Sequence, residues 1–205
     1  SASSSAAPPS VREPMSKVRQ LTAAHMARCW TEIPHVTQFD RADITELEEL
    51  RKRFGKRAEA SGGKLTVTAI LVKVEAAALK VFPKFNASVA METKEVVLHR
   101  HINIGVAVDT DRGLLVPVIR DADTKSILQI AAEMASLAEA ARTKKLAPDA
   151  MQGGTFTITN LGGIGGTNFT PIVNAPEVAI LGVACGGLEP VFNGNVFQPR
   201  LVLPL

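Results

Sequence analysis

Three threonines that could present hydroxyl groups side by side lie just before a glycine-rich loop. From Thr155 to Asn160, threonine alternates with Phe156 and Ile158, which is the period-two pattern of a strand with one apolar face. The threonine hydroxyls therefore share the opposite face. Glycines follow at positions where the backbone can adopt a positive φ or approach another group closely: Gly162, Gly163, Gly165 and Gly166.

The glycine-rich loop does not fit a dinucleotide-binding fingerprint. That fingerprint needs a helix directly after its glycines to hold the pyrophosphate, whereas Pro171 and Pro176 argue against a helix here. The apolar run from Val178 to Val183 instead predicts a buried strand. The stretch is thus expected to form two strands around a loop.

Two further groups of residues could hold a metal ion, but neither is complete. His99 and His101 share one face of a strand, yet no third ligand is near in sequence, so hydrogen-bonding or surface histidines are favoured. Asp109, Asp111 and Gly113 faintly resemble a calcium loop, but the glycine comes too early and no glutamate holds the twelfth position. A turn is expected there, with Asp109 bonding local backbone or, alternatively, orienting a catalytic partner.

The cysteines and the remaining helical histidine have structural interpretations. Cys29 and Cys185 lie far apart and in no metal-ligand spacing, so they are expected to be two reduced thiols. His25 falls four residues after Leu21 on the packed face of a predicted helix, where a hydrogen-bonded, partly buried histidine is expected. No metal site is predicted.

The composition excludes several classes of protein. Lys and Arg number 23 against 20 Asp and Glu, a net charge of only +3, and aromatic residues make up 4% with no tyrosine. These values argue against a broad nucleic-acid surface but permit a local phosphate site. No apolar run approaches the roughly 18 residues of a membrane span, and the first residues lack the pattern of a signal peptide.

One α/β domain is expected from residue 11 to 205, after a Ser/Ala/Pro linker over residues 1–10. Apolar periodicity predicts three helices, and Thr45 with Glu48 forms a capping-box signature that predicts a fourth. The helices are expected at Met15–Glu32, Thr45–Arg57, Thr66–Phe82 and Ser126–Lys144. Further strands are expected at His35–Asp40, Phe85–Met91, Val96–Leu98, Ile102–Val108 and Leu114–Ile119, with a hairpin over Pro190–Leu205 that turns at Asn193 and Gly194.

Several stretches together resemble the dihydrolipoamide acyltransferases, the central components of the 2-oxo acid dehydrogenase complexes. The motifs TFTITNLGGIGGTNFTPIVNAPEVAILGV, IPHVTQFDRADITELEELR and INIGVAVDTDRGLLVPVIRDAD stand in the family's order, and the resemblance covers nearly all residues from about Val11 to Leu205. It implies a chloramphenicol acetyltransferase-like two-layer sandwich, a mixed sheet with helices. NLGGIGGTNFTPIVNAPEVAILGV looks more like acetyl-transferring members, of the pyruvate dehydrogenase complex, than succinyl-transferring ones.

The resemblance also implies partners and a location. Members use coenzyme A as a substrate, carry the lipoyl group on a separate domain, and assemble as trimers or larger cages. They work with the dehydrogenase and lipoamide dehydrogenase components, in the bacterial cytoplasm or the mitochondrial matrix. The opening helix lies against a neighbouring subunit in the family.

Two site residues follow from the resemblance. Thr159 occupies the position of the family's Ser or Thr and is expected to stabilise the oxyanion of acyl transfer; by pattern alone it is an ordinary strand threonine. Arg51 sits where the family contacts the 3′-phosphate of coenzyme A; by pattern alone it belongs to a solvated basic helix face.

The family's general base is the histidine of an H-x-x-x-D-G motif, and none of His25, His35, His99 or His101 stands in one. The motif is expected just after the last strand, so these 205 residues are expected to have little or no turnover alone. The alternatives are a non-catalytic core that only assembles the complex and a free-standing acyltransferase acting on a small molecule.

Overall fold

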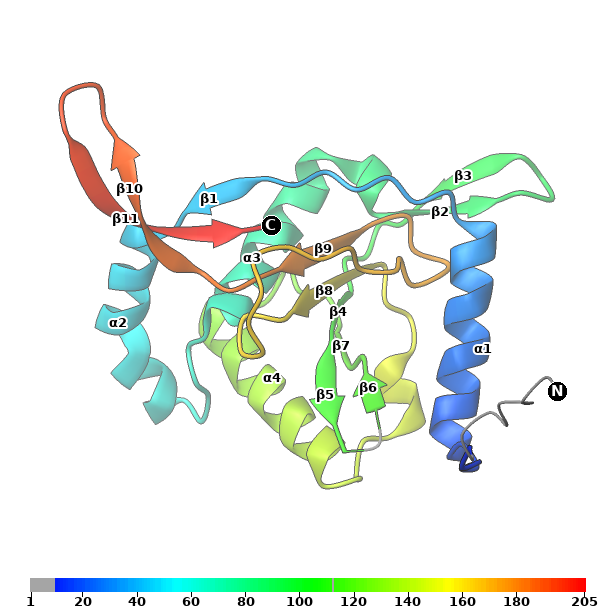
Figure 1. Ribbon diagram of the computed structural model, residues 1–205. Coiled ribbons are helices and arrows are strands. Elements are labelled where there is room, and N and C mark those ends of the chain that lie inside the picture. The colour runs from blue at the N-terminus through cyan, green and yellow to red at the C-terminus, as the bar shows by residue number, and fades with distance from the viewer. Residues whose placement is uncertain (1–9, 112) are drawn as a thin grey trace, which may run out of the picture.

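The computed structural model describes residues 10–111 and 113–205. The linker expected over residues 1–10 therefore lies outside the described residues, apart from Ser10. The described part forms an α/β fold in which helices cover one side of a mixed sheet, as expected (Figure 1).

A four-stranded sheet forms the centre of the fold. Its order is β7 (Val118–Ile119), β4 (Ile104–Val106), β8 (Phe156–Asn160) and β9 (Ile180–Val183). Strand β8 runs parallel to both of its neighbours, whereas β7 is antiparallel to β4. Because β8 is bonded along both edges, its backbone is among the most constrained in the molecule.

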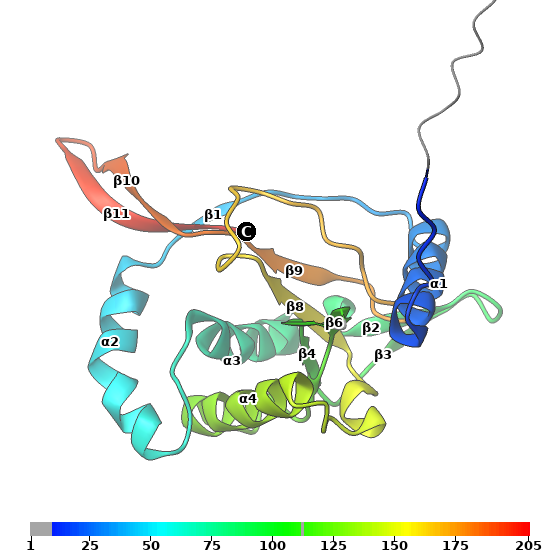
Figure 2. The same cartoon turned by 60° about the horizontal axis from the view of Figure 1, so that its bottom comes forward.

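Helices α3 (Val67–Val81) and α4 (Ile127–Arg142) lie side by side against one face of this sheet (Figure 2). Their apolar sides meet the sheet in one core, in which Val72, Ile130 and Ile158 are fully buried. Ser126 and Gln129 form a reciprocal capping box at the start of α4. The amphipathic pattern that predicts α4 is thus confirmed as a packing stripe.

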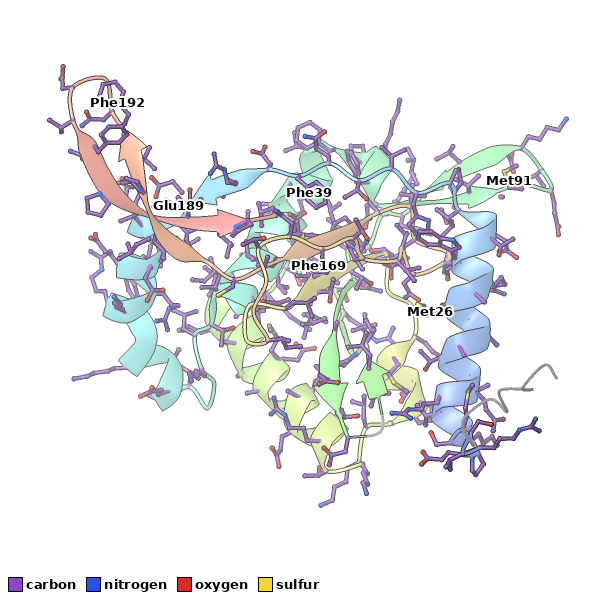
Figure 3. All side chains as sticks on the ribbon, in the orientation of Figure 1. Met26, Phe39, Met91, Phe169, Glu189 and Phe192 are labelled. Atoms are coloured by element: carbon purple, nitrogen blue, oxygen red, sulfur yellow. The ribbon has the colours of Figure 1, made fainter. Side chains whose placement is uncertain are left out.

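A second, antiparallel sheet is formed by β1 (Arg41–Asp43), β11 (Phe197–Pro204) and β10 (Gly187–Phe192). The β10–β11 hairpin projects from the body, with Phe192 near its tip (Figure 3). Its turn lies where Asn193 and Gly194 predict it, and Phe192 pairs with Phe197 across it. The hairpin begins at Gly187, three residues before the expected Pro190, and β11 ends at Pro204.

The strand expected from His35 to Asp40 is wrong. Backbone pairing with β11 begins at Asp40, which exchanges two hydrogen bonds with Leu205, and β1 starts at Arg41. Alternating residues form a strand only where a neighbouring backbone bonds them, and none of the described strands bonds residues 34–39. Residues 34–39 therefore lie outside every described strand, although their side chains alternate in the sequence.

The capping box expected at the second helix is also wrong. Helix α2 (Thr45–Ala60) begins with Thr45 as its first helical residue, and the Asp43 carboxylate accepts the Thr45 backbone N–H at 3.0 Å. The Thr45 hydroxyl donates to the same carboxylate, while Glu48 pairs with Arg51. The Asp43 carboxylate, from the preceding strand, therefore caps the helix in place of the expected Thr45–Glu48 capping box.

The other elements keep close to their expected positions. Ile102–Val108 is divided between β4 and a hairpin of β5 (Val108–Thr110) with β6 (Gly113–Leu115), which confirms a turn at Asp111. Helix α1 (Lys17–Glu32), strands β2 (Ala87–Ala90) and β3 (Glu95–Leu98), and the short 3-10 helices Pro83–Phe85 and Pro148–Met151 complete the chain. None of the described helices is long and apolar enough to span a membrane.

Two glycines near α2 test how tightly the helical layer is packed. A Cβ on Gly63 would lie 2.5 Å from the backbone nitrogen of Ala132 in α4, whereas a Cβ on Gly55 would meet nothing within 4 Å. Gly63→Ala should therefore lower the free energy of unfolding by about 1–3 kcal/mol. Gly55→Ala, inside α2, should raise it by up to about 1 kcal/mol, because glycine is a poor helix former. Denaturant unfolding of both variants checks the pair; equal effects would contradict the packing.

Candidate functional site

The threonine face of β8 lies on the side of the sheet away from the helical core. Phe156 and Ile158 are buried within that core, and the alternation of the strand places Thr155, Thr157 and Thr159 opposite them. All three threonines are buried, Thr159 at 9% exposure. The predicted hydroxyl face is confirmed.

Two of these three hydroxyls already have partners. Thr155 accepts from the Asn103 backbone N–H and donates to the Asn103 carbonyl, and Thr157 donates to the Glu177 carboxyl at 2.9 Å. The Thr159 hydroxyl has no hydrogen-bond partner within residues 10–111 and 113–205. Thr159 is therefore the hydroxyl on this face that remains available to a ligand.

The glycine-rich loop begins directly after β8. The Asn160 side chain accepts the backbone N–H of Gly162, and a Cβ on Gly162 would lie 3.1 Å from the Ala184 carbonyl oxygen. Gly165 and Gly166 have φ of 105° and 96°. Both expected uses of glycine are thus present, and no helix occurs between β8 and β9, which confirms that the loop is not a dinucleotide fingerprint.

A cavity of about 500 Å³ borders the end of the sheet. Its walls include residues 33–40, Phe169 and Gly182, and Figure 3 shows Phe169 beside β9. Gly182 is the register partner of Thr159, and a Cβ there would lie 3.0 Å from the Phe169 ring. The absence of a side chain on Gly182 therefore keeps the loop close to β9 beside Thr159.

The described histidines do not supply a free base beside Thr159. His35 Nε2 accepts the Val173 N–H at 2.9 Å, so its Nδ1 carries the proton and donates to the Ile33 carbonyl. The rings of His99 and His101 contact each other in a tilted arrangement with centroids 5.4 Å apart, and burial lowers the pKa of His99. No cluster of metal-ligating side chains occurs in the described part of the chain.

A Cys–His pair also occurs, but it lacks the geometry of a nucleophile and its base. Cys29 Sγ and the Asn174 amide oxygen both contact the same nitrogen of His25, Nε2, at 3.5 Å and 2.8 Å. A catalytic dyad with an orienting amide uses opposite ring nitrogens. Cys29 is also fully buried, so the pair is structural, as expected for His25.

Arg51 belongs to α2, a helix that stands apart from β8 (Figure 1). Its guanidinium binds both carboxylate oxygens of Glu48, at 2.6 Å and 2.7 Å, and donates to the Leu65 carbonyl at 3.3 Å. The Arg51 hydrogen bonds lower the pKa of Glu48. No hydrogen bond joins Arg51 to Thr159 among the described residues, and neither lines the 500 Å³ cavity; the two predicted site residues are not brought together.

Asn103 and Glu177 hold the hydroxyl face in place, and sequence patterns alone did not single them out. Both are buried polar residues, at 7% and 5% exposure. Glu177 carried one usable signal, because a single acid directly before the apolar run of Val178 to Val183 is unusual in a buried strand region. Asn103 carried none, since its partner Thr155 is 52 residues away.

Comparison with known proteins identifies the family. Residues 7–205 match the family described as 2-oxoacid dehydrogenases acyltransferase (catalytic domain). The dihydrolipoyllysine-residue acetyltransferase components of the pyruvate dehydrogenase complexes of Pseudomonas aeruginosa and Azotobacter vinelandii are each 56% identical to this chain, over 93% and 94% of it. The chain spans 35% and 30% of the lengths of these relatives.

Solved structures agree with the family. The fold matches Azotobacter vinelandii dihydrolipoamide acetyltransferase with a TM-score of 0.92 and 53% identity, covering 97% of this chain and 85% of that one. That structure was used to investigate a serine, a histidine and an asparagine in the catalytic mechanism. The cubic core of a pyruvate dehydrogenase multienzyme complex matches equally well.

Chloramphenicol acetyltransferase matches with a TM-score of 0.50 at 15% identity, covering 88% of this chain and 81% of that one. This likeness shows the fold alone and confirms the expected sandwich. Together with the free hydroxyl on β8 and the match of residues 7–205 to the family model, these similarities show that the chain belongs to the 2-oxoacid dehydrogenase acyltransferases, as a catalytic domain.

Proposed function

We propose that this domain passes an acetyl group between dihydrolipoamide and coenzyme A, within a longer parent protein of a pyruvate dehydrogenase complex. The observation that carries the proposal is Thr159, which is 9% exposed on a strand paired along both edges and whose hydroxyl has no partner in the described residues. The names of the relatives support the acetyl group and the complex. The lipoyl group belongs to a separate domain, in keeping with the third of its relatives' length that this chain spans.

Transfer between two thiols proceeds through one tetrahedral intermediate. A base takes the proton of the attacking thiol, the thiolate adds to the thioester carbonyl, and the carbonyl oxygen becomes an oxyanion. In our proposal the Thr159 O–H donates to that oxyanion, the carbonyl re-forms, and the other thiolate leaves and takes up the proton. No acyl-enzyme forms.

The base belongs, in this proposal, to a histidine outside residues 1–205. His25 and His35 are committed to Asn174 and to Val173 and Ile33. His99 and His101 lie between β3 and β4, and neither belongs to the family's histidine motif. The domain described here therefore contributes the oxyanion donor and the walls of the site, while the proton is moved by a group from elsewhere.

Arg51 is our proposed contact for the 3′-phosphate of coenzyme A. A guanidinium has five N–H donors, of which two bind Glu48 and one binds the Leu65 carbonyl. Two donors are left to bind phosphate oxygens. Glu48 fixes the orientation of the guanidinium, although its ionised carboxylate also offsets part of the positive charge that a phosphate would meet.

We further propose a trimer, extended to a larger cage, that binds the dehydrogenase and lipoamide dehydrogenase components. The related cubic core supports assembly. So do the apolar side chains exposed on the projecting β10–β11 hairpin, among them Leu188 at 74% and Phe197 at 70% exposure. Because the relatives are bacterial, we place the parent protein in the cytoplasm rather than in a mitochondrial matrix.

Substituting Thr159 tests the proposed donor. In the parent protein, Thr159→Ala should lower kcat for acetyl transfer from acetyl-coenzyme A to dihydrolipoamide by about 100- to 1,000-fold, because one oxyanion donor is lost. Thr159→Ser should keep most of the rate. Thr93→Ala, which removes an exposed hydroxyl from the β2–β3 turn, is the matched control. A Thr159→Ala enzyme as fast as wild type would favour a domain that only assembles the complex.

Comparing two forms of coenzyme A tests Arg51. Arg51→Ala should weaken binding of coenzyme A by about 10- to 100-fold, given about 1.5–3 kcal/mol for a hydrogen bond to a charged group. It should leave binding of 3′-dephospho-coenzyme A nearly unchanged. Lys56→Ala, which removes an exposed cation from the same helix, controls for net charge. Calorimetry measures all four affinities, and equal weakening of both ligands by Arg51→Ala would rule out the phosphate contact.

A further inference from the structure

A buried carboxyl group lies beside the proposed donor, on the loop that leads into β9. Glu177 Oε1 accepts hydrogen bonds from the Thr157 hydroxyl at 2.9 Å and from the Asn174 amide at 3.4 Å. Its Oε2 is buried without a partner among the described residues. Burial raises the pKa of Glu177 to about 7, so near neutral pH the group is protonated in a large fraction of molecules.

The same loop is bonded to helix α1. Because the Asn174 amide nitrogen points to Glu177, its oxygen accepts from His25, whose Nε2 therefore carries the proton. The next backbone N–H, of Ala175, donates to the buried Cys29 sulfur at 3.3 Å. A continuous set of hydrogen bonds thus runs from α1 through the loop to the middle of β8.

These bonds end two residues from Thr159. Thr157 and Thr159 lie on the same face of β8, separated by about 7 Å along the strand. The loop from Leu161 to Ala179 leaves β8 directly after Asn160 and returns at Glu177, where it is bonded back to Thr157. Glu177 therefore belongs to the loop beside the donor and bonds the hydroxyl next to it on the same face of the strand.

We propose that Glu177 is a positioning residue for Thr159, acting through the Thr157 hydroxyl and, with Asn174 and His25, holding the Leu161–Ala179 loop against β8. The inference rests on the proposed acyl transfer. Oxyanion stabilisation is sensitive to such positioning, because a donor contributes only when it lies within hydrogen-bond distance of the developing charge. Replacing Thr157 should therefore change turnover although Thr157 itself contacts no reacting atom.

The carboxyl also gives the network a dependence on pH. Burial raises the pKa of Glu177 from its ordinary value of about 4.5 to about 7, so its contribution to stability is fully present below about pH 4.5 and is lost as the pH rises through about 7. The other titratable groups in the network are His25 and Cys29 of α1. Arg120 donates to the carbonyls of Asp149 and Gln152 rather than to Glu177.

The test uses the parent protein and steady-state kinetics with acetyl-coenzyme A and dihydrolipoamide. Thr157→Val keeps the shape of the side chain but removes its hydroxyl, and should lower kcat by about 10- to 100-fold with little change in KM for acetyl-coenzyme A. Thr157→Ser should restore most of kcat. Glu139→Gln, an exposed acid of α4, should behave as wild type.

A second variant, Glu177→Gln, keeps an oxygen to accept from Thr157 and cannot titrate. Its thermal unfolding midpoint should fall less than that of wild type between about pH 5 and pH 8, and its kcat should exceed that of Glu177→Ala. Wild-type kcat in a folded Thr157→Val enzyme, or equal pH dependence of unfolding in Glu177→Gln and wild type, would overturn the positioning role. Absence of transfer by the wild-type parent protein would instead refute the proposed function, and the positioning role with it.

Discussion

Parallel pairing of β8 with β4 and β9 is the constraint on which the rest of the structure depends. It fixes which face each residue of β8 presents: Ile158 enters the core against the helices, and Thr159 takes the opposite face. A shift of one residue in register would exchange the two sets of side chains. Burying Ile158 therefore also places the hydroxyl, so the hydrophobic effect and the proposed chemistry select the same register.

The hydroxyl face shows how a strand can present one free donor among bonded ones. A buried hydroxyl without a hydrogen bond is unfavourable. Asn103 bonds the Thr155 hydroxyl, and Glu177 bonds the Thr157 hydroxyl. Thr159 stands near the end of the strand, beside the glycine-rich loop, and its hydroxyl has no hydrogen-bond partner among the described residues. The unpaired Thr159 hydroxyl is not among the fully buried unpaired atoms of the described residues, so it stays accessible at the position where the proposed function needs an unoccupied donor.

Sequence patterns predicted the elements whose cause is local. The amphipathic stripe predicted helix α4, and the alternation of apolar residues predicted strand β8 with one apolar face. Both predictions are confirmed. The strand expected at His35–Asp40 failed because pairing depends on a distant neighbour, β11. The cap of α2 failed because Asp43, in a strand paired with that same neighbour, replaced the expected capping box.

The candidate site was predictable only in part, for a related reason. Thr159 and Arg51 were singled out by resemblance to a family, and the free hydroxyl and the spare guanidinium donors add physical support to both. The contact of Glu177 with Thr157 spans 20 residues, and that of Asn174 with His25 spans 149. No periodicity encodes contacts of this length, because they arise only when the sheet brings the loop and the helix together.

The most direct test of the central claim, that this domain holds the oxyanion donor but not the base, compares turnover of residues 1–205 with that of the parent protein. Both are assayed for acetyl transfer from acetyl-coenzyme A to dihydrolipoamide at saturating substrate. The mechanism predicts that the parent is active and that the 205-residue chain is slower by about 100- to 10,000-fold, the contribution of general-base catalysis. Comparable turnover would contradict it, because the base would then lie within residues 1–205.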